Sequence, residues 1–284
     1  MTVIAAACIQ LRSGKDISEN TARAEDLIRA AAGDGATYIQ TPEMSNVLVR
    51  SREELIARID VLDRDVFVTM ARQVAADLGV FVHVGSVAVL AEGGQVANRA
   101  VLIAPNGAIV ETYDKVHMFD VDLPGGESWR ESSTYRAGEQ VPVVDLPFGK
   151  LGMAICYDIR FPGIFRAQSR LGADILTAPA AFTRQTGQAH WHVLQRARAI
   201  ENGAYVISAA QGGRHEDGRE TFGHSLIVDP WGDVVAELDT DAPGHLVAEI
   251  DLARVSKARA RIPAIANERD FDCRMTRAFR EEPA

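Results

Sequence analysis

The chain has 284 residues, of which 47% are apolar and 24% are charged, so it is long enough to bury a sizeable core without disulfides or metals. Its 30 basic and 39 acidic residues give a net charge of -9, which argues against a nucleic-acid or anionic-membrane partner. The N-terminus lacks the features of a signal peptide and no apolar run is long enough to span a bilayer, so we expect a cytoplasmic protein.

Strand-like apolar runs alternate with helical patterns in the first part of the chain. The predicted elements are strand 3–9, helix 16–32, strand 37–41, helix 64–78 and strand 80–90. Asp16, followed three residues later by Glu19, resembles a capping box and predicts where the first helix begins. Strands 97–104 and 108–113 flank Pro105-Asn106-Gly107, which predicts a hairpin.

The alternation continues through the second half of the chain. The predicted elements are strand 151–155, a helix that Pro162 begins, strand 173–178, helix 189–202, strand 204–210, a hairpin around Pro230-Trp231-Gly232 and strand 244–250. No linker rich in proline, glycine or serine divides the sequence. The order of elements predicts an α/β protein with parallel crossovers and hairpins, whose sheets lie between helical layers.

Three chemically different residues each follow a predicted strand directly: Glu43, Lys115 and Cys156. Ligands of α/β sheets gather at the carboxyl ends of strands, so these side chains form a plausible site. Taken singly, a glutamate or lysine at a strand end is more often a solvated surface residue. Taken together, they supply the nucleophile, proton carrier and positive charge that acyl transfer needs.

Cys156 is the cysteine whose position favours chemistry. The chain has two others, Cys8 and Cys273, and three scattered cysteines make neither a disulfide framework nor a four-ligand zinc site. A free cysteine is more often a small buried apolar residue. Cys156, however, lies between a strand and a predicted helix, where backbone N–H groups favour a thiolate and hold an oxyanion. The glycine pattern of a G-x-S-x-G elbow is absent, and position alone leaves both readings open.

Histidines, the usual partners of a catalytic cysteine, give no local support for a Cys–His pair. His117 and His224 follow predicted strands and are either neighbours of the site or structural hydrogen-bonding groups. Asp120 and Asp122 lie near His117, but no second cluster with ligand spacing accompanies them. We therefore expect no metal and no cofactor.

Three motifs, in a fixed order, carry a resemblance to a known family. They are 41–44 (TPEM), 113–120 (YDKVHMFD) and 152–162 (GMAICYDIRFP). With these motifs the sequence resembles the nitrilase, or carbon–nitrogen hydrolase, superfamily over almost its whole length. Further segments resemble the branch that contains deaminated glutathione amidase and ω-amidase. They are 98–99 (NR), 187–191 (GQAHW), 196–199 (RARA), 209–215 (AAQGGRH), 223–225 (GHS) and 229–232 (DPWG).

The resemblance implies a catalytic triad of Glu43, Lys115 and Cys156, with Glu131 as a second glutamate that positions the lysine and the substrate. Glu127 is a nearby competitor for that last role. We further expect the backbone N–H of Tyr157 to help hold the oxyanion of a thioester pathway. The implied reaction is hydrolysis of a small carboxamide.

The implied fold is a four-layer α-β-β-α sandwich formed by residues 1–260. The segment 261–284 is expected to pack on a neighbouring subunit of a homodimer or larger homo-oligomer.

The substrate is the least determined part of this reading. A dicarboxylate monoamide or deaminated glutathione is expected, with Arg160 and Arg184 as weak candidates for contacting a carboxylate. The segment 178–181 (APAA) departs from the tyrosine-proline pairing that we associate with both named amidases. The alternatives are an N-carbamoyl amino acid amidohydrolase, a metal-dependent phosphoesterase and a non-catalytic interaction protein on the same scaffold.

Overall fold

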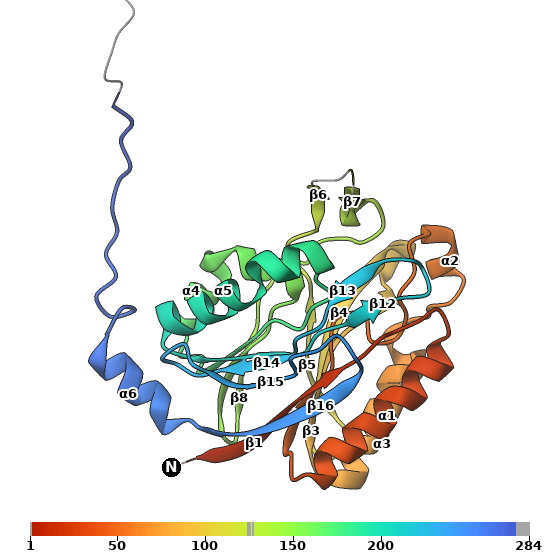
Figure 1. Ribbon diagram of the computed structural model, residues 1–284, viewed down its shortest axis with the longest axis horizontal. Coiled ribbons are helices and arrows are strands. Elements are labelled where there is room, and N and C mark those ends of the chain that lie inside the picture. Colours follow the sequence, from red (N-terminus) through yellow and green to blue (C-terminus); the bar gives the residue numbers. More distant parts are fainter. Residues whose placement is uncertain (1, 124–125, 127, 277–284) are drawn as a thin grey trace, which may run out of the picture.

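The computed structural model describes residues 2–123, 126 and 128–276. Within them, two six-stranded sheets lie face to face and pairs of helices cover their outer sides (Figure 1). This arrangement is the four-layer α-β-β-α sandwich expected from the sequence. In the described part of the chain, no helix combines the length and apolar character needed to cross a membrane.

Sheet I holds the first strands of the chain and the last one, in the order β16-β1-β2-β3-β4-β5. Its strands are β1 Val3–Gln10, β2 Tyr38–Gln40, β3 Phe81–Leu90, β4 Val96–Ile103, β5 Ile109–Asp114 and β16 Gly244–Asp251. β1, β2 and β3 run parallel, while β16 joins β1 antiparallel, from the pair Val3 and Asp251 to the pair Gln10 and Gly244.

Sheet II is built from the middle of the chain, in the order β15-β14-β11-β10-β9-β8. Its strands are β8 Val143–Leu146, β9 Gly149–Gly152, β10 Ile175–Thr177, β11 Tyr205–Ser208, β14 Leu226–Val228 and β15 Val234–Glu237. Two small ribbons stand outside the sheets: β6 Asp120–Asp122 with β7 Ser128–Arg130, and β12 Gly212–Arg214 with β13 Glu220–Phe222.

Helices α1 Ile17–Gly33 and α3 Val66–Leu78 cover sheet I, and α4 Pro162–Arg170 and α5 Arg184–Asn202 cover sheet II. The Asp16 side chain accepts from the Glu19 N–H at 3.0 Å, so the predicted cap does begin α1. The remaining helices are short. They are α2 Arg52–Ile56, η1 Leu62–Arg64, η2 Glu92–Gly94, η3 Glu131–Ser133, η4 Cys156–Arg160 and α6 Ala253–Arg261.

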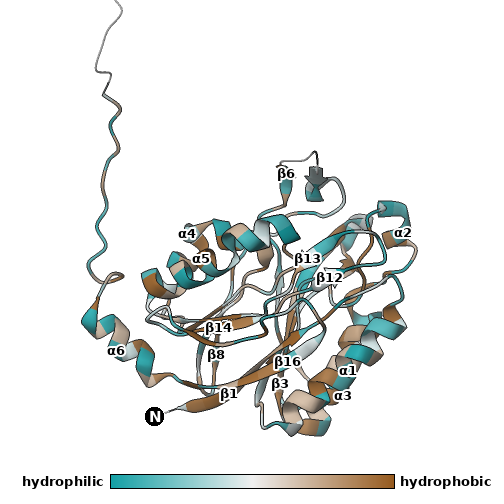
Figure 2. Ribbon diagram, in the orientation of Figure 1, coloured by the Kyte–Doolittle hydropathy of each residue, from teal (hydrophilic) through white to brown (hydrophobic). Residues whose placement is uncertain are grey.

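The largest core lies between the two sheets. It packs Cys8, Tyr38 and Leu102 of sheet I together with residues such as Leu176 and Ile207 of sheet II. A second core lies between sheet I and helices α1 and α3. Figure 2 accordingly shows apolar residues concentrated on the strands, because strands covered on both faces have no polar side.

The chain around Cys156 differs from the prediction of a strand that leads directly into a helix. β9 ends at Gly152, and the one-turn helix η4 begins at Cys156, before α4 begins at Pro162. The reason is the left-handed backbone of Cys156, with φ of 48°, which reverses the chain after the strand. Cys156 therefore lies on a tight turn and not at the start of a long helix.

The C-terminal end leaves the body of the protein after α6 (Figure 1). Glu268 still pairs with Arg170 at 3.0 Å and with Arg166 at 3.6 Å, which ties the chain to α4. Beyond it, Phe271 and Met275 are 83% and 86% exposed. Two large apolar side chains are thus left without cover within this chain.

Candidate active site

A cavity of about 360 Å³ brings together the residues that follow the strand ends. Glu43 follows β2 and Lys115 follows β5, so both come from sheet I, whereas Cys156 comes from sheet II. All three line this cavity, and so do Glu131 and Tyr157. The site therefore lies across the seam between the two sheets.

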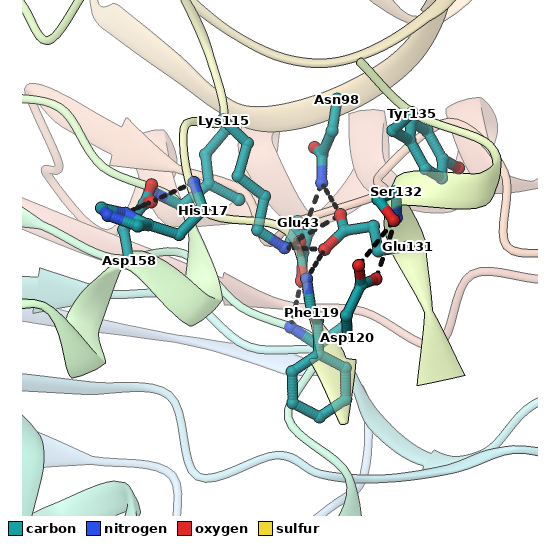
Figure 3. Close-up of polar contacts among 12 residues, drawn as sticks. Glu43, Asn98, Lys115, His117, Phe119, Asp120, Glu131, Ser132, Tyr135 and Asp158 are labelled. Atoms are coloured by element: carbon teal, nitrogen blue, oxygen red, sulfur yellow. Dashed lines mark hydrogen bonds and ion pairs between the residues drawn. The ribbon is translucent and has the colours of Figure 1, made fainter. Parts of the chain in front are cut away.

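The ammonium group of Lys115 lies between two carboxylates (Figure 3). Its Nζ is 2.9 Å from Glu43 Oε1 and 2.8 Å from Glu131 Oε2. Asn98, on β4, donates to the same two carboxylates at 2.9 and 3.1 Å. The side chain of Lys115 is only 2% exposed, so its position is fixed by these partners and not by water.

Burial opposes ionisation of Lys115, but the charges of Glu131 and Glu43 outweigh it and raise its pKa well above the usual value. Burial likewise opposes ionisation of Glu43. The charge of Lys115, and hydrogen bonds from Lys115, Cys156 and Asn98, outweigh burial and lower the pKa of this carboxyl group. At neutral pH the ammonium and the Glu43 carboxylate are therefore both ionised.

Burial raises the pKa of Cys156 well above its usual value, and the negative charge of Glu43 adds to this effect more than Lys115 offsets it. The resting side chain is thus a thiol hydrogen-bonded to Glu43, which is placed to take its proton. The physical reason is that the sulfur is buried against a carboxylate. Only a one-turn helix follows Cys156, so no long helix is present to favour the anion.

The backbone at Cys156 is held in place from both sides. Its N–H donates to the Pro179 carbonyl at 2.9 Å, beyond the end of β10. The first hydrogen bond within η4 is donated by the Asp158 N–H to the Ile155 carbonyl. The Tyr157 N–H lies one residue before that donor, so it has no partner inside this helical turn. The Ala181 N–H donates to Glu43 Oε2 at 2.9 Å and also contacts the Cys156 sulfur. The Ala181 N–H therefore lies against both the thiol and the carboxylate of Glu43.

Asp158 is a buried carboxylate whose part in the site was not predicted from the sequence. It accepts from the Ile155 N–H at 2.9 Å and from the Tyr113 hydroxyl at 2.6 Å. It also accepts from the His117 N–H and Nδ1 at 3.0 and 2.8 Å, as Figure 3 shows. His117 is therefore a partner of Asp158. One carboxylate joins the turn that carries Cys156 to the segment that carries Lys115. The only signal in the sequence is an aspartate two residues after the cysteine, and burial cannot be read from it.

Glu131 is held at the end of the β6–β7 ribbon. The Phe119 N–H donates to its Oε2 at 2.7 Å, and its own N–H donates to the Phe119 carbonyl at 3.3 Å. Glu131 is thus a carboxylate in contact with Lys115. Glu127, the competitor named from the sequence, lies outside the described residues.

The two candidate arginines differ in position. Arg160 lines the cavity, lies 5.2 Å over the Phe182 ring and contacts His190 Nδ1 at 3.2 Å. Arg184 is not among the cavity-lining residues and pairs with Asp241 at 2.6 Å and Glu220 at 3.2 Å. Arg184 therefore lies at the start of α5, where two carboxylates neutralise its side chain, and its contact with a substrate stays a prediction.

One cluster in the described residues has the side chains of a metal site. His192 Nε2 and His224 Nδ1 lie 2.7 and 2.9 Å from Glu237 Oε1, and these ligand atoms are all within 4.8 Å of one another. None of the three lines the cavity that holds Cys156. Asp120 and Asp122 instead bind Ser132 and Arg130.

The profile of the carbon-nitrogen hydrolase family matches residues 5–260. The chain is 42% identical over 266 residues to deaminated glutathione amidase of Synechocystis, which covers 92% of this chain and 96% of that protein. Among solved structures, the C. elegans NitFhit protein matches with a TM-score of 0.88 at 34% identity, over 95% of this chain and 66% of that one.

An amidase from Nesterenkonia, solved with acrylamide added to its active-site cysteine, matches with a TM-score of 0.76 at 25% identity. The match covers 92% of this chain and 98% of that one. The similarity of this chain to these proteins extends over nearly all of its length.

Proposed function

The chain belongs to the carbon-nitrogen hydrolase family, and from this premise we propose that it hydrolyses a small carboxamide through a thioester on Cys156. Glu43 acts as the general base and Lys115 as the cationic partner. The observation that carries the proposal is the contact of one thiol, one carboxylate and one ammonium group in a single buried cavity. The site works in a cytoplasmic homo-oligomer and needs no metal or cofactor.

The first step forms the thioester. Glu43 takes the thiol proton as the Cys156 sulfur attacks the amide carbon, and the carbonyl oxygen becomes an oxyanion. The Lys115 ammonium and the Tyr157 N–H hold this oxyanion. Glu43 then gives its proton to the departing nitrogen, so that the carbon–nitrogen bond breaks and an amine or ammonia leaves.

The second step restores the cysteine. Glu43 takes a proton from a water molecule that attacks the thioester, and returns that proton to the sulfur as the carbon–sulfur bond breaks. The product is a carboxylate. Glu131 takes no proton in this scheme and serves to position Lys115 and the substrate.

The charges of the site suit this sequence of steps. Lys115 faces two carboxylates at rest. When Glu43 accepts the proton its negative charge disappears, and the oxyanion supplies a new one. The ammonium group therefore faces the same number of anions before and after attack, and little reorganisation of the buried site is needed.

The substrate that we propose carries a carboxylate on its acyl side, as in a dicarboxylate monoamide or deaminated glutathione. Deaminated glutathione amidase is the name of the relative from Synechocystis. Arg160 supports this choice because it lines the cavity beside Tyr157, and no carboxylate of the described residues pairs with it. A guanidinium that no carboxylate neutralises is suited to binding one.

The test is a product-release screen against deaminated glutathione, α-ketoglutaramate, succinamate, butyramide and N-carbamoyl amino acids, with Cys156→Ala as the inactive control. We expect succinamate to exceed butyramide by about tenfold or more in kcat/KM, because a charge-assisted contact is worth about 1.5 kcal/mol or more. Preference for a carbamoyl compound would instead identify an N-carbamoyl amidohydrolase. Turnover by Cys156→Ala, or loss of activity with EDTA that a divalent ion restores, would contradict the cysteine mechanism.

A further inference from the structure

Two histidines and one glutamate meet outside the cavity that holds Cys156, at residues that the proposed reaction does not use. His192 lies on α5, His224 on the loop between β13 and β14, and Glu237 at the end of β15. Both imidazole rings reach the same carboxylate oxygen, because His192 Nε2 and His224 Nδ1 lie 2.7 and 2.9 Å from Glu237 Oε1. We call these three residues the His–Glu–His cluster. In Figure 1, α5 lies over the part of sheet II that β14 and β15 form.

The ligand atoms of the cluster have the types and spacing that a zinc ion requires. Two imidazole nitrogens and one carboxylate oxygen make up a common three-ligand zinc site. These atoms all lie within 4.8 Å of one another, and atoms bound to one tetrahedral zinc ion are about 3.3 Å apart. The two contacts to Glu237 therefore need to open by only about half an ångström when a metal ion replaces the protons between them.

The charge and exposure of the cluster also suit a cation. In the part of the chain that the structure describes, the ion-pair partners of Glu237 are the two histidines and no lysine or arginine. A divalent ion consequently has no permanent positive charge to displace. All three side chains are partly exposed, so an ion can enter from solvent and keep water at its fourth position.

Hydrogen bonds at neighbouring residues fix the three ligands relative to one another. The Trp191 indole donates to the His224 carbonyl at 2.8 Å, which ties α5 to the loop that carries the second histidine. The Leu238 N–H donates to the Ser225 carbonyl at 3.0 Å, which ties the end of β15 to the same loop. The cluster is thus assembled by the fold before any ion binds.

The ring of His224 is oriented in the same way. Phe222 stacks on it, with 4.2 Å between ring centres and an angle of 19°. Helix α5 holds Phe222 in turn, since a Cβ atom on Gly187 would be only 2.2 Å from the Phe222 Cβ. The backbone of His224 is left-handed, with φ of 58°, a conformation that persists only where the surroundings fix it. Ligands held in this way lose little freedom on binding a metal.

We propose that the His–Glu–His cluster binds one Zn²⁺ ion through His192 Nε2, His224 Nδ1 and the Glu237 carboxylate. The ion joins α5, the β13–β14 loop and β15, so its role is to stabilise the outer side of sheet II. Since none of the three residues lines the cavity that holds Cys156, the ion takes no part in the proposed hydrolysis. This inference goes beyond the proposed function and does not depend on it.

The experiment is a calorimetric titration of the metal-free full-length protein with Zn²⁺. We expect one strong site per chain, weakened about a hundredfold or more by each of His192→Gln, His224→Asn and Glu237→Gln. Asparagine tolerates the left-handed backbone at position 224, and glutamine keeps the shape of Glu237. The matched control is His245→Gln, because His245 also lies 2.8 Å from a carboxylate but belongs to no three-ligand group among the described residues. It should bind Zn²⁺ as tightly as the wild type.

Thermal unfolding tests the stabilising role. At a Zn²⁺ concentration a hundredfold above Kd, we expect the Tm of the wild type to rise by about 5 °C and that of Glu237→Gln to stay unchanged. The Tm of each metal-free variant shows whether it has folded. Absence of Zn²⁺ binding by the wild type, or full binding by all three folded variants, would overturn the proposal.

A titration with Co²⁺ identifies the ligand atoms without any substitution. Visible absorption bands of a tetrahedral Co²⁺ ion with no sulfur-to-metal charge-transfer band would support the cluster, whose ligands are nitrogen and oxygen. A charge-transfer band would place the ion on a cysteine and overturn the assignment.

Discussion

Cys156 takes up its position through a backbone conformation that residues other than glycine seldom adopt. Its φ is 48°, and Met44, which follows Glu43, has φ of 55°. A left-handed conformation costs about 1–2 kcal/mol for such residues, and it persists only where the surroundings fix it. Here the bond from the Cys156 N–H to the Pro179 carbonyl and the bond from the Ile155 N–H to the Asp158 carboxylate do so. Backbone strain at the proposed nucleophile itself, and at the residue after the proposed base, is consistent with a site built for chemistry.

At this scale Glu43→Gln is the most informative substitution. An amide cannot take the thiol proton, so we expect the rate of turnover to fall by about a hundred- to ten-thousand-fold. Any thioester that still forms should accumulate, because water is no longer activated. Intact-protein mass spectrometry after mixing with a turned-over amide measures this adduct. The exposed Glu139→Gln is the control, and normal turnover of Glu43→Gln without an adduct would refute the base assignment.

The dependence of activity on pH follows from the two shifted groups. The base must be ionised, and the pKa of Glu43 lies below 4.5. The thiol must carry the proton that Glu43 takes, and the pKa of Cys156 lies above 9.0. We therefore expect kcat/KM to stay level from about pH 5 to about pH 9 and to fall outside this range. A fall in kcat/KM on the acidic side that begins near neutral pH would show that the resting enzyme does not hold an ionised Glu43 beside a protonated Cys156.

At the scale of the elements, the site depends on how closely the two sheets approach beside it. Gly85, on β3, lies where the pairing of β3 with β4 shifts register. A Cβ atom there would be 2.0 Å from the Thr41 carbonyl oxygen and 2.5 Å from the Cβ of Pro179. Thr41 lies on the segment that leads to Glu43, and Pro179 accepts the N–H of Cys156. Gly85 thus lets both halves of the site meet.

Gly85→Ala should for this reason damage activity without touching the chemistry. The added methyl group forces the Glu43 segment and Pro179 apart, and a displacement of about 1 Å costs on the order of a hundredfold in rate. Overpacking should also lower the free energy of unfolding by about 1–3 kcal/mol. Kinetics and urea unfolding measure the two effects. Gly163→Ala, on α4 with open space around it, is the matched control, and equal behaviour of the two variants would contradict the argument.

The order of strands and long helices could be predicted from the sequence because buried strands are continuous apolar runs with turn signals between them. The β6–β7 ribbon was not predicted, because residues 120–130 are mostly polar and show too little alternation of apolar and polar residues to indicate strands. The start of α5 was placed at residue 189 and not at Arg184, because its first turn is polar and contains Gly187.

The site was predictable to the extent that Glu43, Lys115 and Cys156 follow strands and lie in recognisable motifs. Asn98 was missed as a contact of both carboxylates, since a polar residue inside a strand gives no sign of what it faces. The stacking of Arg50 on the Trp129 ring was missed because these two residues lie far apart in the chain. Only the fold brings these residues together.

At the scale of the whole molecule, several large apolar side chains are exposed, and we propose that they take part in the association of two or more copies of the chain. On the face that α5 presents, Val193 and Ile200 are 67% and 52% exposed, and Phe271 and Met275 follow beyond Glu268. Burial of such side chains gives about 25 cal/mol per Å² of apolar surface. A second copy of the chain is the partner that we propose for the segment from residue 261 onward.

Removal of residues 269–284 tests this assembly, because it leaves α6 and the pair of Glu268 with Arg170 in place. We expect the shortened protein to dissociate at higher concentration than the full chain, as measured by analytical ultracentrifugation over a dilution series. The double substitution Phe271→Ala and Met275→Ala should act in the same direction. An unchanged mass at every concentration for both forms would contradict a role of this segment in association.

The pairing of β1 with β16 has a consequence for the protein while it is being synthesised on the ribosome. β1 is synthesised before the other strands of sheet I, yet its partner on one side, Gly244–Asp251, is the last strand of that sheet in the chain. Until that stretch emerges, the nascent chain carries an open and largely apolar strand edge, a known starting point for aggregation. Translation arrested before residue 244 should therefore leave protease-sensitive chains that occupy chaperones, whereas arrest after the last strand has emerged should give a resistant product. Early resistance would mean that the first strand finds another partner during synthesis.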